Sequence, residues 1–436
     1  MEVSKMQSVI VFGLGRIGLP TALVAAESGF NVMGIDKNED LISKLKKDKK
    51  PINEPMVEDL LRKHLGKRFH PYSMKELSKD FCQRAQIILI TIGIDKIISP
   101  NHWDLSDLYL VIEFMIDQDI VKGRTIIVRT TMPIGTTRKI RGFIEEKTSY
   151  CEGKDFFLTF VPERLAQGKA IAEEKQLPKI IGAFEDAGFE HTRGFFKQIG
   201  GKIRRVSTPE VAEYVKLIDN AWRHTLFAFS NDLALCGELV GVDVVEAIDT
   251  ANFDYPRNSV PIPGPVSGYC LGKDPHILES SFNPIAKMRG FNSVWYYAAK
   301  SSEWLIEYIS QEVKGKLVLV AGLSFKENVD DYRESHGVKL SRKLVARGCK
   351  VIVTDPYLGK SEYTEIPEDL RGLVIGYSDL KKCLIENQFD TVIVCVKHDE
   401  YYNLGDYLQG ETYVIDLWNI LPEMQNKGNY KGLGRG

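Results

Sequence analysis

The sequence predicts an α/β fold in which two Rossmann-like, doubly wound domains are joined by a long central helix and a helical segment. In the first half, short apolar runs typical of buried strands alternate with stretches of helical periodicity, the order expected of a parallel sheet covered by helices. The last quarter of the chain repeats this alternation, and one unbroken helical pattern lies between them. With 436 residues the chain exceeds what a single core usually holds, so several domains are expected.

The chain opens with the pattern of a dinucleotide-binding βαβ unit. Ser8–Phe12 predicts a buried strand, a helix follows to about Gly29, and Asn31–Asp36 predicts a second strand that ends in a carboxylate. Glycines in the turn after the first strand allow the backbone to approach a pyrophosphate, which the free N–H groups of the helix N-terminus then bind. Cofactor contacts are therefore predicted for the six turn residues, which are Gly13, Leu14, Gly15, Arg16, Ile17 and Gly18.

The acidic residue that ends the second strand indicates which dinucleotide binds. Asp36 falls 23 positions after Gly13, where a carboxylate accepts hydrogen bonds from the ribose hydroxyls and repels a 2′-phosphate. NAD is therefore the predicted cofactor, rather than NADP. Further strands of this first sheet are predicted at residues 85–92, 124–130 and 156–160.

A long helix separates the two α/β halves. From residue 210 to about 241, apolar residues recur at helical spacing without a break, which predicts a helix of roughly 45–50 Å. The second half lacks a GxGxxG pattern, so it is predicted to bind something other than NAD. Its strands are expected at 316–323, 350–355, 390–396 and 412–416, with a helix near 335–347. The glycine-rich, basic stretch 426–436 predicts a frayed tail.

Composition argues against several classes of partner. The 57 basic residues nearly balance the 59 acidic ones, so no general attraction to nucleic acid or to an anionic membrane is expected. The first residues are too polar for a signal peptide, and no apolar run reaches the ~18 residues of a membrane helix. Seven scattered cysteines without a CxxC pair indicate a reducing compartment, so we expect a cytoplasmic protein without a metal site.

Cys270 differs from the other cysteines in its surroundings. It lies in a Gly/Pro-rich loop, with Lys273 and Asp274 within four positions. A thiolate is a soft nucleophile that adds to a carbonyl and later leaves, and a nearby cation lowers the pKa of the thiol from its usual ~8.5. A reactive thiol in a chain that binds NAD predicts oxidation of an aldehyde through a thiohemiacetal and a thioester.

Six motifs occur in a characteristic order: the glycine turn 13–18 and the segments 130–135, 162–164, 213–220, 263–274 and 324–335. Together they resemble the UDP-glucose/GDP-mannose dehydrogenase family of nucleotide-sugar 6-dehydrogenases, over nearly the whole chain. These enzymes oxidise the C6 alcohol of a nucleotide-linked hexose to a carboxylate and reduce two NAD+. The resemblance implies an NAD-binding domain at 1–205, a central helical and dimerisation domain with the cysteine loop at 206–312, and a UDP-binding domain at 313–436.

The resemblance implies a catalytic centre around Cys270 as the nucleophile. Lys216 would stabilise alkoxide and oxyanion character, and Asn220 would hold the sugar or a water; fixed donors of this kind are usually a large catalytic term. Lys216 and Asn220 are spaced i, i+4, so they share one face of the long helix.

Three further residues are implied in proton transfer. Asp274 would act through an ordered water as a base for the C6 hydroxyl, or would orient Lys216. Glu163 would activate the water that hydrolyses the thioester. Thr131 would hydrogen-bond that water or the cofactor.

The resemblance also implies a set of binding residues. By resemblance, Arg333 would reach towards NAD. Arginine suits phosphate because its planar fork donates two parallel hydrogen bonds. Arg257 would contact the substrate from a neighbouring subunit, so a homodimer or a higher homo-oligomer is expected. Beyond the glycine turn and Asp36, cofactor contacts are expected from Thr91, Thr131 and Arg333. Contacts with the nucleotide sugar are expected from Glu163, Arg164, Lys216, Asn220, Arg257, Gly268, Tyr269, Phe325 and Lys326.

Two departures from the family pattern bear on the substrate. Tyr269 precedes the cysteine where the family usually has Ser or His, and Trp418 stands where an arginine is common. The Pro162-Glu163-Arg164 segment resembles the UDP-N-acetylmannosamine/UDP-N-acetylglucosamine dehydrogenase branch. We therefore expect four-electron oxidation of a UDP-N-acetylhexosamine to its uronic acid, in polysaccharide biosynthesis, with UDP-glucose or another UDP-hexose as the alternative.

Three other classes remain open on the residues alone. A two-electron, hydroxyacid-type dehydrogenase shares a Rossmann domain followed by a helical domain with a lysine, but leaves Cys270 and the second α/β half unexplained. A non-catalytic nucleotide-sugar-binding paralogue would have no use for Cys270, Lys216, Asn220 and Asp274. A regulatory redox sensor would depend on the cysteine alone.

Overall fold

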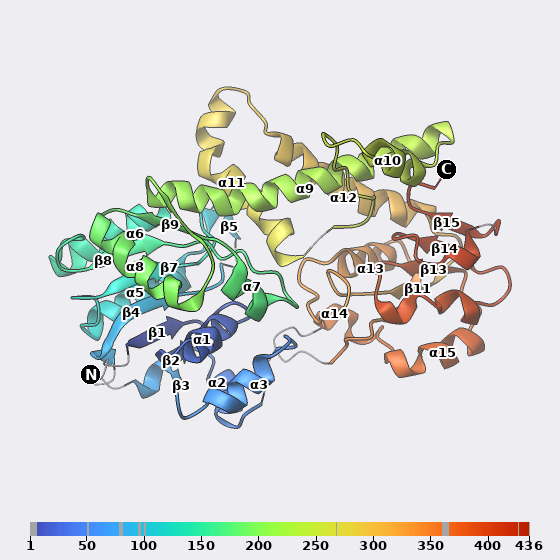
Figure 1. Cartoon of the computed structure of the whole chain (residues 1–436). Coiled ribbons are helices and arrows are strands. Elements are labelled where there is room, and N and C mark those ends of the chain that lie inside the picture. Colours follow the sequence, from blue (N-terminus) through green and yellow to red (C-terminus); the bar gives the residue numbers. More distant parts are fainter. Residues whose placement is uncertain are drawn as a thin grey trace. The chain divides into compact units, whose positions relative to one another are not determined.

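The computed structural model describes residues 7–49, 52–77, 82–94, 97–99, 102–266, 268–359, 366–425 and 427–435. The chain divides into two compact units (Figure 1). The first consists of Met1–Asp219 with Ile277–Pro284, and the second of Asn220–His276 with Ile285–Gly436. Each unit contains its own sheet.

The first unit is built on an eight-stranded sheet with the order β10-β9-β8-β7-β4-β1-β2-β3. Neighbouring strands are parallel except β8 and β9, which pair antiparallel. The chain order reverses between β1 and β4, the switch point beside which α/β sheets bind ligands. The strands are β1 (Ser8–Phe12), β2 (Asn31–Asp36), β3 (Phe69–Ser73), β4 (Ala85–Ile90), β7 (Thr125–Val128), β8 (Phe157–Phe160), β9 (Lys179–Ala183) and β10 (Ile203–Val206).

Helices cover both faces of this sheet, because right-handed crossovers leave β1 and β4 in opposite directions. Phe30, after α1, packs on Phe195 of α8 with ring centroids 5.0 Å apart, and Tyr109 of α5 packs on Phe143 of α6 at 5.1 Å. The helices are α1 (Gly18–Glu27), α2 (Glu39–Lys46), α3 (Val57–His64), α5 (Ser106–Asp117), α6 (Thr136–Thr148), α7 (Ala170–Gln176) and α8 (Asp186–Ile199). A short antiparallel pair, β5 (Ile97–Ser99) and β6 (His102–Trp103), lies before α5.

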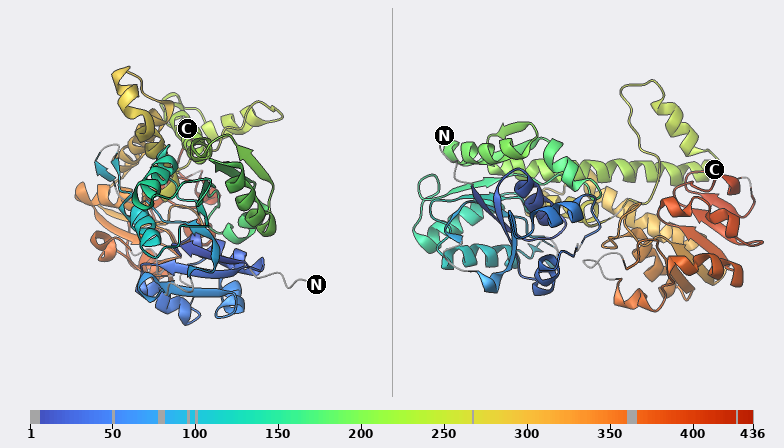
Figure 2. Two further views of the ribbon diagram at one scale, coloured as in Figure 1. Left: turned by 90° about the vertical axis from the view of Figure 1, so that its left-hand side faces the viewer. Right: turned by 60° about the horizontal axis from the view of Figure 1, so that its bottom comes forward.

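Four helices occupy the chain between the two sheets: α9 (Pro209–Val240), α10 (Val244–Asn252), α11 (Tyr269–Met288) and α12 (Val294–Glu312). α9 has 32 residues and is therefore about 48 Å long; it runs as one continuous helix in Figures 1 and 2. Both α9 and α11 contribute residues to both units. No helix among the described residues is long and apolar enough to cross a membrane.

The second unit contains a five-stranded, fully parallel sheet with the order β12-β11-β13-β14-β15. Alternate residues of its strands enter two cores: Val318 and Val320 pack towards α12 and α13, while Leu319 and Ala321 pack towards α15. The elements are β11 (Leu317–Ala321), α13 (His336–Ala346), β12 (Lys350–Thr354), α14 (Glu368–Arg371), α15 (Tyr377–Glu386), β13 (Thr391–Val394), β14 (Tyr413–Asp416) and β15 (Tyr430–Gly432), with 3₁₀ turns at Asp399–Tyr401, Leu404–Tyr407 and Pro422–Met424.

The structure confirms the predicted α/β class with two parallel-dominated sheets and a long central helix. The expected strands and the helix at 210–241 all occur, most of them within two residues of the predicted limits. Two details were not predicted. The antiparallel pairing of β8 with β9 breaks the parallel order of the first sheet, and β3, β9 and β10 extend that sheet at its two ends.

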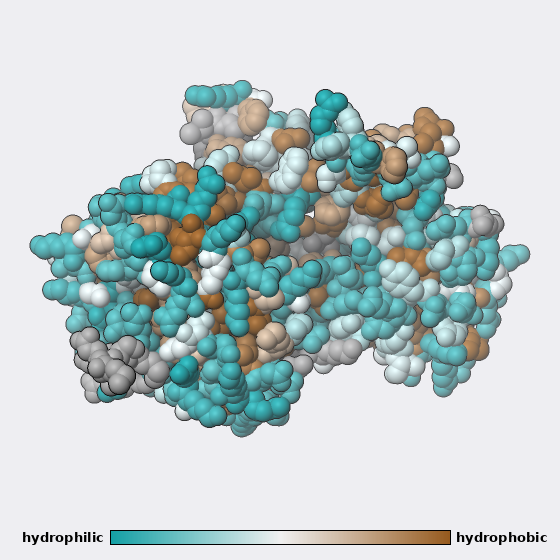
Figure 3. All heavy atoms as spheres, viewed as in Figure 1, coloured by the Kyte–Doolittle hydropathy of each residue, from teal (hydrophilic) through white to brown (hydrophobic). Residues whose placement is uncertain are grey.

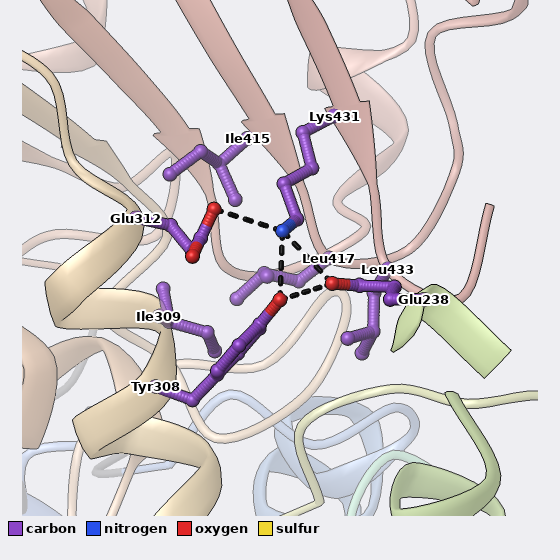
Figure 4. A pocket seen from close by; sticks show the side chains of 8 residues that line it. All are labelled: Glu238, Tyr308, Ile309, Glu312, Ile415, Leu417, Lys431 and Leu433. Atoms are coloured by element: carbon purple, nitrogen blue, oxygen red, sulfur yellow. Dashed lines mark hydrogen bonds and ion pairs between the residues drawn. The ribbon is translucent and has the colours of Figure 1, made fainter. Parts of the chain in front are cut away.

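The predicted frayed tail is wrong over the described residues 427–435 of the stretch 426–436. β15 adds a strand to the second sheet, and Leu433 is buried. Figure 4 shows how a side chain reinforces the strand: the Lys431 ammonium lies 2.8 Å from Glu238, 2.8 Å from the Tyr308 hydroxyl and 2.9 Å from Glu312. Burial and the neighbouring Glu238 raise the pKa of Tyr308 to about 12. Backbone pairing and this ionic cluster therefore order a segment whose composition alone indicates flexibility.

Candidate active site

The glycine turn after β1 brings helix α1 close to the sheet. Gly13 has a φ of +87°, and its N–H donates to the Ile35 carbonyl at 2.8 Å. A Cβ at Gly18 would lie 1.7 Å from the Gly13 carbonyl oxygen, so no other residue fits there without moving the backbone. Thr91 fastens the turn from β4, because its hydroxyl donates to the carbonyls of Phe12 and Gly13 at 2.9 and 2.8 Å.

This turn fits a dinucleotide. The N-cap residue of α1, Ile17, makes no side-chain cap hydrogen bond. In the first turn the Leu19 N–H already donates to the Gly15 carbonyl at 3.1 Å, and Pro20 has no N–H. The Gly18 N–H and the positive end of the helix dipole are therefore the groups that can face a pyrophosphate. Asp36 lies at the end of β2, half-buried, with Oδ2 accepting from the Leu14 N–H at 2.7 Å and Oδ1 from the Asn38 N–H at 2.9 Å. These bonds hold the carboxylate beside the turn, where it can also accept from ribose hydroxyls.

A buried ion pair in the first unit joins two predicted catalytic residues. The Lys216 ammonium lies 3.5 Å from Glu163 Oε2, and both side chains are more than nine-tenths buried. The other oxygen of Glu163 accepts from the Leu165 N–H. The neighbouring Arg164 donates to Asp219 at 2.7 Å. Helix α9 therefore supports the 163–164 segment at two points one helical turn apart.

The second unit contains the other half of the predicted catalytic set. Asn220 donates its amide hydrogen to Asp274 Oδ2 at 2.5 Å, and both residues are almost fully buried. One turn later on α9, His224 Nδ1 lies 2.9 Å from the Leu271 carbonyl, and burial lowers the pKa of His224. These two bonds hold the first two turns of α11, which carry Cys270, an exposed cysteine outside any disulfide.

The residues around Cys270 pack on the loop between β11 and α13. Gly268 has a φ of +101°, and a Cβ there would lie 2.4 Å from the Phe325 ring. The next residue, Tyr269, has the Lys273 ammonium 4.0 Å and the Arg333 guanidinium 4.2 Å from its ring centroid. The cysteine loop and the predicted nucleotide-binding loop are therefore in direct contact within one unit.

In the structure the predicted site residues form three separate groups. Glu163 and Lys216 form one, Asn220 and Asp274 a second, and Gly268, Tyr269, Phe325 and Arg333 a third. Thr131 is half-buried after β7 and makes no hydrogen bond with another described residue. Arg257 is exposed after α10 with its guanidinium 4.7 Å from the Tyr255 ring centroid, and Lys326 is half-buried beside Phe325. The first group belongs to the first unit, and the second and third belong to the second.

Three supporting residues were not predicted. His224 could have been found from its spacing, since 216, 220 and 224 recur every fourth residue on one helix face. Asn231 holds the Pro-Gly-Pro loop by two hydrogen bonds to Gly264, at 2.9 and 3.1 Å. Asp331 holds Arg333 in a fork, at 2.9 and 2.7 Å. Asp331 lies two residues before Arg333 in the motif 324–335, so this spacing could have indicated it. Asn231 depends on tertiary placement, and we find no local signal for it.

A dinucleotide turn, a buried lysine–carboxylate pair and an exposed cysteine define an NAD-dependent dehydrogenase. Comparison with known proteins gives the family. Residues 7–200 match the NAD binding domain of the UDP-glucose/GDP-mannose dehydrogenase family, residues 210–291 its central domain and residues 319–423 its UDP binding domain. The chain belongs to this family, and is an NAD-dependent oxidoreductase of nucleotide sugars.

Relatives extend over the whole chain. A UDP-N-acetyl-D-mannosamine dehydrogenase of Pyrococcus horikoshii is 29% identical and covers 98% of this chain and 99% of its own length. One from Methanococcus vannielii is 30% identical, covering 96% and 94%. A solved structure of UDP-D-ManNAc dehydrogenase from Pyrococcus horikoshii has a TM-score of 0.85 at 26% identity, covering 99% of this chain and 100% of that one. These comparisons confirm the predicted family, enzyme class and cofactor.

Proposed function

We propose that this enzyme oxidises the C6 hydroxyl of a UDP-N-acetylhexosamine to the uronic acid in two NAD-dependent steps, through a thiohemiacetal and a thioester on Cys270. The observation that carries the proposal is an exposed cysteine on the first turn of α11, with a lysine and a buried, hydrogen-bonded carboxylate on the same two turns. A simple alcohol dehydrogenase needs no such thiol.

The reaction balances with two NAD+ and one water. The C6 alcohol loses a proton and a hydride and becomes an aldehyde. The Cys270 sulfur then adds to that carbon, and loss of a second hydride leaves a thioester. Water cleaves the thioester, which releases the carboxylate and restores the thiol. Each of the two NAD+ molecules, when bound, would accept one hydride; every other step is assigned to residues of the chain.

Lys216 and Glu163 are proposed to act as a coupled pair. The ammonium offers a fixed positive charge to the alkoxide and the tetrahedral oxyanion, in a buried setting where such a charge acts strongly. Glu163, held by the Leu165 N–H and by Lys216, is proposed as the base that takes a proton from the hydrolytic water. Asp274, held by Asn220, is proposed as the group that receives the C6 hydroxyl proton through a water. Thr131 is proposed to hydrogen-bond the hydrolytic water or the cofactor.

We propose that the first unit binds most of NAD and that the second unit binds the nucleotide sugar. The glycine turn, Asp36 and Thr91 would hold NAD, with Arg333 contributing a guanidinium. In the second unit, Phe325 and Lys326 are proposed to contact the nucleotide sugar together with Gly268 and Tyr269. Support comes from the match of 319–423 to the UDP binding domain of the family.

The sugar is proposed to carry an N-acetyl group. The Pro-Glu-Arg segment at 162–164 suits this class by resemblance. The relatives from Pyrococcus horikoshii and Methanococcus vannielii are named UDP-N-acetyl-D-mannosamine dehydrogenases. One from Ralstonia solanacearum is named an NDP-N-acetyl-D-galactosaminuronic acid dehydrogenase, at 25% identity. UDP-N-acetylmannosamine is therefore the first substrate to test.

The test is the amount of NADH formed per mole of sugar with UDP-ManNAc, UDP-GlcNAc, UDP-glucose, UDP-galactose and GDP-mannose. We expect two NADH with an N-acetylated substrate, and loss of the second NADH or of all turnover in Cys270→Ala. Cys151→Ala is the matched control, because Cys151 is also exposed but lies outside the site. One NADH in the wild type would indicate a two-electron dehydrogenase, and an unchanged Cys270→Ala variant would remove the thioester from the mechanism.

We also propose that the active form is a homodimer or a higher homo-oligomer. Large apolar side chains are exposed along α9, among them Trp222 (61%), Phe229 (52%) and Leu239 (87%), and hydrophobic residues are visible over this helix in Figure 3. Such a stripe is unusual on a monomer. Light scattering on the purified protein tests the proposal, and Trp222→Glu should shift the mass to that of one chain.

A further inference from the structure

Tyr269 is the residue by which this chain departs most clearly from its family beside the cysteine, and its ring lies between two cations. Lys273 follows it by four residues on α11, so the two side chains share one helix face. The Lys273 ammonium is 4.0 Å and the Arg333 guanidinium 4.2 Å from the ring centroid. Both distances are well inside the range in which an aromatic face attracts a cation.

Other contacts restrict the same arrangement. Asp331 holds Arg333 in a two-pronged ion pair at 2.9 and 2.7 Å. The Gly268 N–H donates to the Glu334 carbonyl at 3.3 Å, and Gly268 lies against the Phe325 ring. Tyr269 is therefore fixed from its own backbone and from the loop that carries Arg333.

The two positive charges beside position 269 show what an aromatic ring contributes there. Lys273 and Arg333 are both positive and both lie near one side chain, so each raises the electrostatic energy of the other. Asp331 compensates part of the Arg333 charge, and the aromatic face, which carries partial negative charge, offsets part of the remaining repulsion. Of the two residues usual at this position in the family, serine has no such face and histidine has a smaller one.

We propose that Tyr269 is a positioning residue, whose ring holds the Arg333 guanidinium and the Lys273 ammonium beside the first turn of α11, which carries Cys270. The inference rests on the proposed function, which gives Arg333 a role in binding NAD and Cys270 the role of nucleophile. Through Arg333 the ring sets the affinity for NAD+, and through Lys273 it sets the reactivity of the Cys270 thiol.

The experiment compares Tyr269→Leu and Tyr269→Phe in the full-length enzyme, with Tyr402→Leu, an exposed tyrosine of the same unit, as control. Calorimetry gives the Kd for NAD+, and peptide mass spectrometry gives the rate at which iodoacetamide alkylates Cys270. Tyr269→Leu should weaken NAD+ binding about tenfold and slow alkylation several-fold, while Tyr269→Phe restores most of both because the ring remains. KM for NAD+ should rise more than kcat falls.

A double variant separates positioning from general damage. If the ring acts on the thiol through Lys273, then Tyr269→Leu added to Lys273→Met changes the alkylation rate no further. The proposal is overturned if Tyr269→Leu behaves as wild type, or if Tyr269→Phe is as damaged as Tyr269→Leu. NAD+ binding and alkylation need no sugar substrate. A failure of the thioester mechanism would therefore appear in the NADH stoichiometry and leave these two readouts intact.

Discussion

The two sheets begin with the same turn, although only the first has the dinucleotide pattern in its sequence. Gly13 follows β1 with a φ of +87°, and Gly322 follows β11 with a φ of +103°. The Gly13 N–H donates to the Ile35 carbonyl on the neighbouring strand at 2.8 Å, and the Gly322 N–H donates to the Thr354 carbonyl at 2.9 Å. Both turns need the left-handed backbone that glycine adopts most readily.

The two turns are also alike in a second glycine, at the start of the helix that follows. A Cβ at Gly18 would lie 1.7 Å from the Gly13 carbonyl oxygen, and one at Gly337 would lie 2.1 Å from the Gly322 carbonyl oxygen. Each helix therefore passes very close to the turn that precedes it. The spacing differs, because the first pair is five residues apart and the second is fifteen. The extra residues form the loop that carries Phe325, Lys326 and Arg333.

The two turns differ in how far the acidic residue and the helix N-terminus are exposed. Asp36 is half-buried, whereas Asp355, at the same place after β12, is fully buried. Asp355 accepts from the N–H groups of Leu323 and Ser324, both at 2.8 Å, and lies 3.2 Å from His398. α13 is also capped by the Ser335 side chain, while α1 has no side-chain cap among the described residues. The first turn has a half-buried carboxylate and a helix N-terminus without a side-chain cap. For this reason we propose that the first turn, and not the second, binds the cofactor.

The largest effects should come from alanine at the two close-approach glycines. Gly18→Ala and Gly337→Ala each place a methyl group on a backbone carbonyl, so each should destabilise its own unit by about 3 kcal/mol or more. Only Gly18→Ala should also abolish NAD+ binding, because only that helix N-terminus is proposed to face the pyrophosphate. Hydrogen exchange by mass spectrometry locates the loss of stability, and calorimetry measures NAD+ binding.

Gly142→Ala and Gly372→Ala are the controls, since a Cβ at either meets nothing within 4 Å. If a folded Gly337→Ala protein lost NAD+ binding while Gly18→Ala retained it, the functional division between the two turns would be wrong.

Asp355→Asn should have the next largest effect, and it should depend on pH. Burial alone would raise the pKa of Asp355, but the His398 contact and the backbone donors outweigh it and hold the pKa below its usual value. A depressed pKa stabilises the fold above the unfolded value of about 3.9 and loses that contribution as the pH falls through the folded value. Asparagine turns an N–H group towards donors, which should cost about 2–4 kcal/mol at neutral pH.

Urea denaturation between about pH 7 and pH 3 measures this effect. The wild type should lose stability towards the acid end more steeply than Asp355→Asn, and the curves should converge. Asp406→Asn, at an exposed carboxylate, is the control. A constant difference across the whole range would show that the Asp355 charge is not what matters.

Local patterns predicted much of this fold. β1, β2 and α9 were found from their apolar periodicity, since each buries a continuous face. β15 was missed because Tyr430–Gly432 has no apolar run, and its order comes from the strand beside it and from Lys431. Strand direction was missed at β8 and β9 because apolar residues carry no record of which way a strand runs.

For the candidate site, too, local patterns were predicted from the sequence and long-range contacts were not. Cys270, Lys216 and Asn220 were predicted from motif and spacing, and their roles stay predictions. The resemblance between the two turns was not seen, because fifteen residues separate Gly322 from Gly337 and no short pattern spans them. The stacking of Tyr269 on Arg333 joins residues 64 positions apart, and only the folded chain brings them together.

Asp36→Asn tests the open carboxylate of the comparison with a smaller effect. Asparagine can still accept from the Leu14 N–H, but its NH2 group then faces the Asn38 N–H. Because the site is half-buried, the free energy of unfolding should fall by only about 1–2 kcal/mol. Loss of the charge should weaken NAD+ binding about tenfold and reduce the preference for NAD+ over NADP+, because repulsion of the 2′-phosphate disappears. Fluorescence titration with both cofactors measures this, with Asp59→Asn as an exposed control. An unchanged preference would mean that Asp36 does not face the ribose.

The smallest effect is expected where the two turns are fastened to the neighbouring strand. The Thr91 N–H donates to Phe12 as the Cys395 N–H donates to Ala321, but only Thr91 adds a hydroxyl, which reaches Gly13 at 2.8 Å. Thr91→Val removes that bond and should cost about 1 kcal/mol, with a modest loss of NAD+ affinity. Cys395→Val replaces one buried apolar side chain with another and should cost no more. Equal losses of NAD+ affinity in both variants would contradict a role for the Thr91 hydroxyl in shaping the cofactor turn.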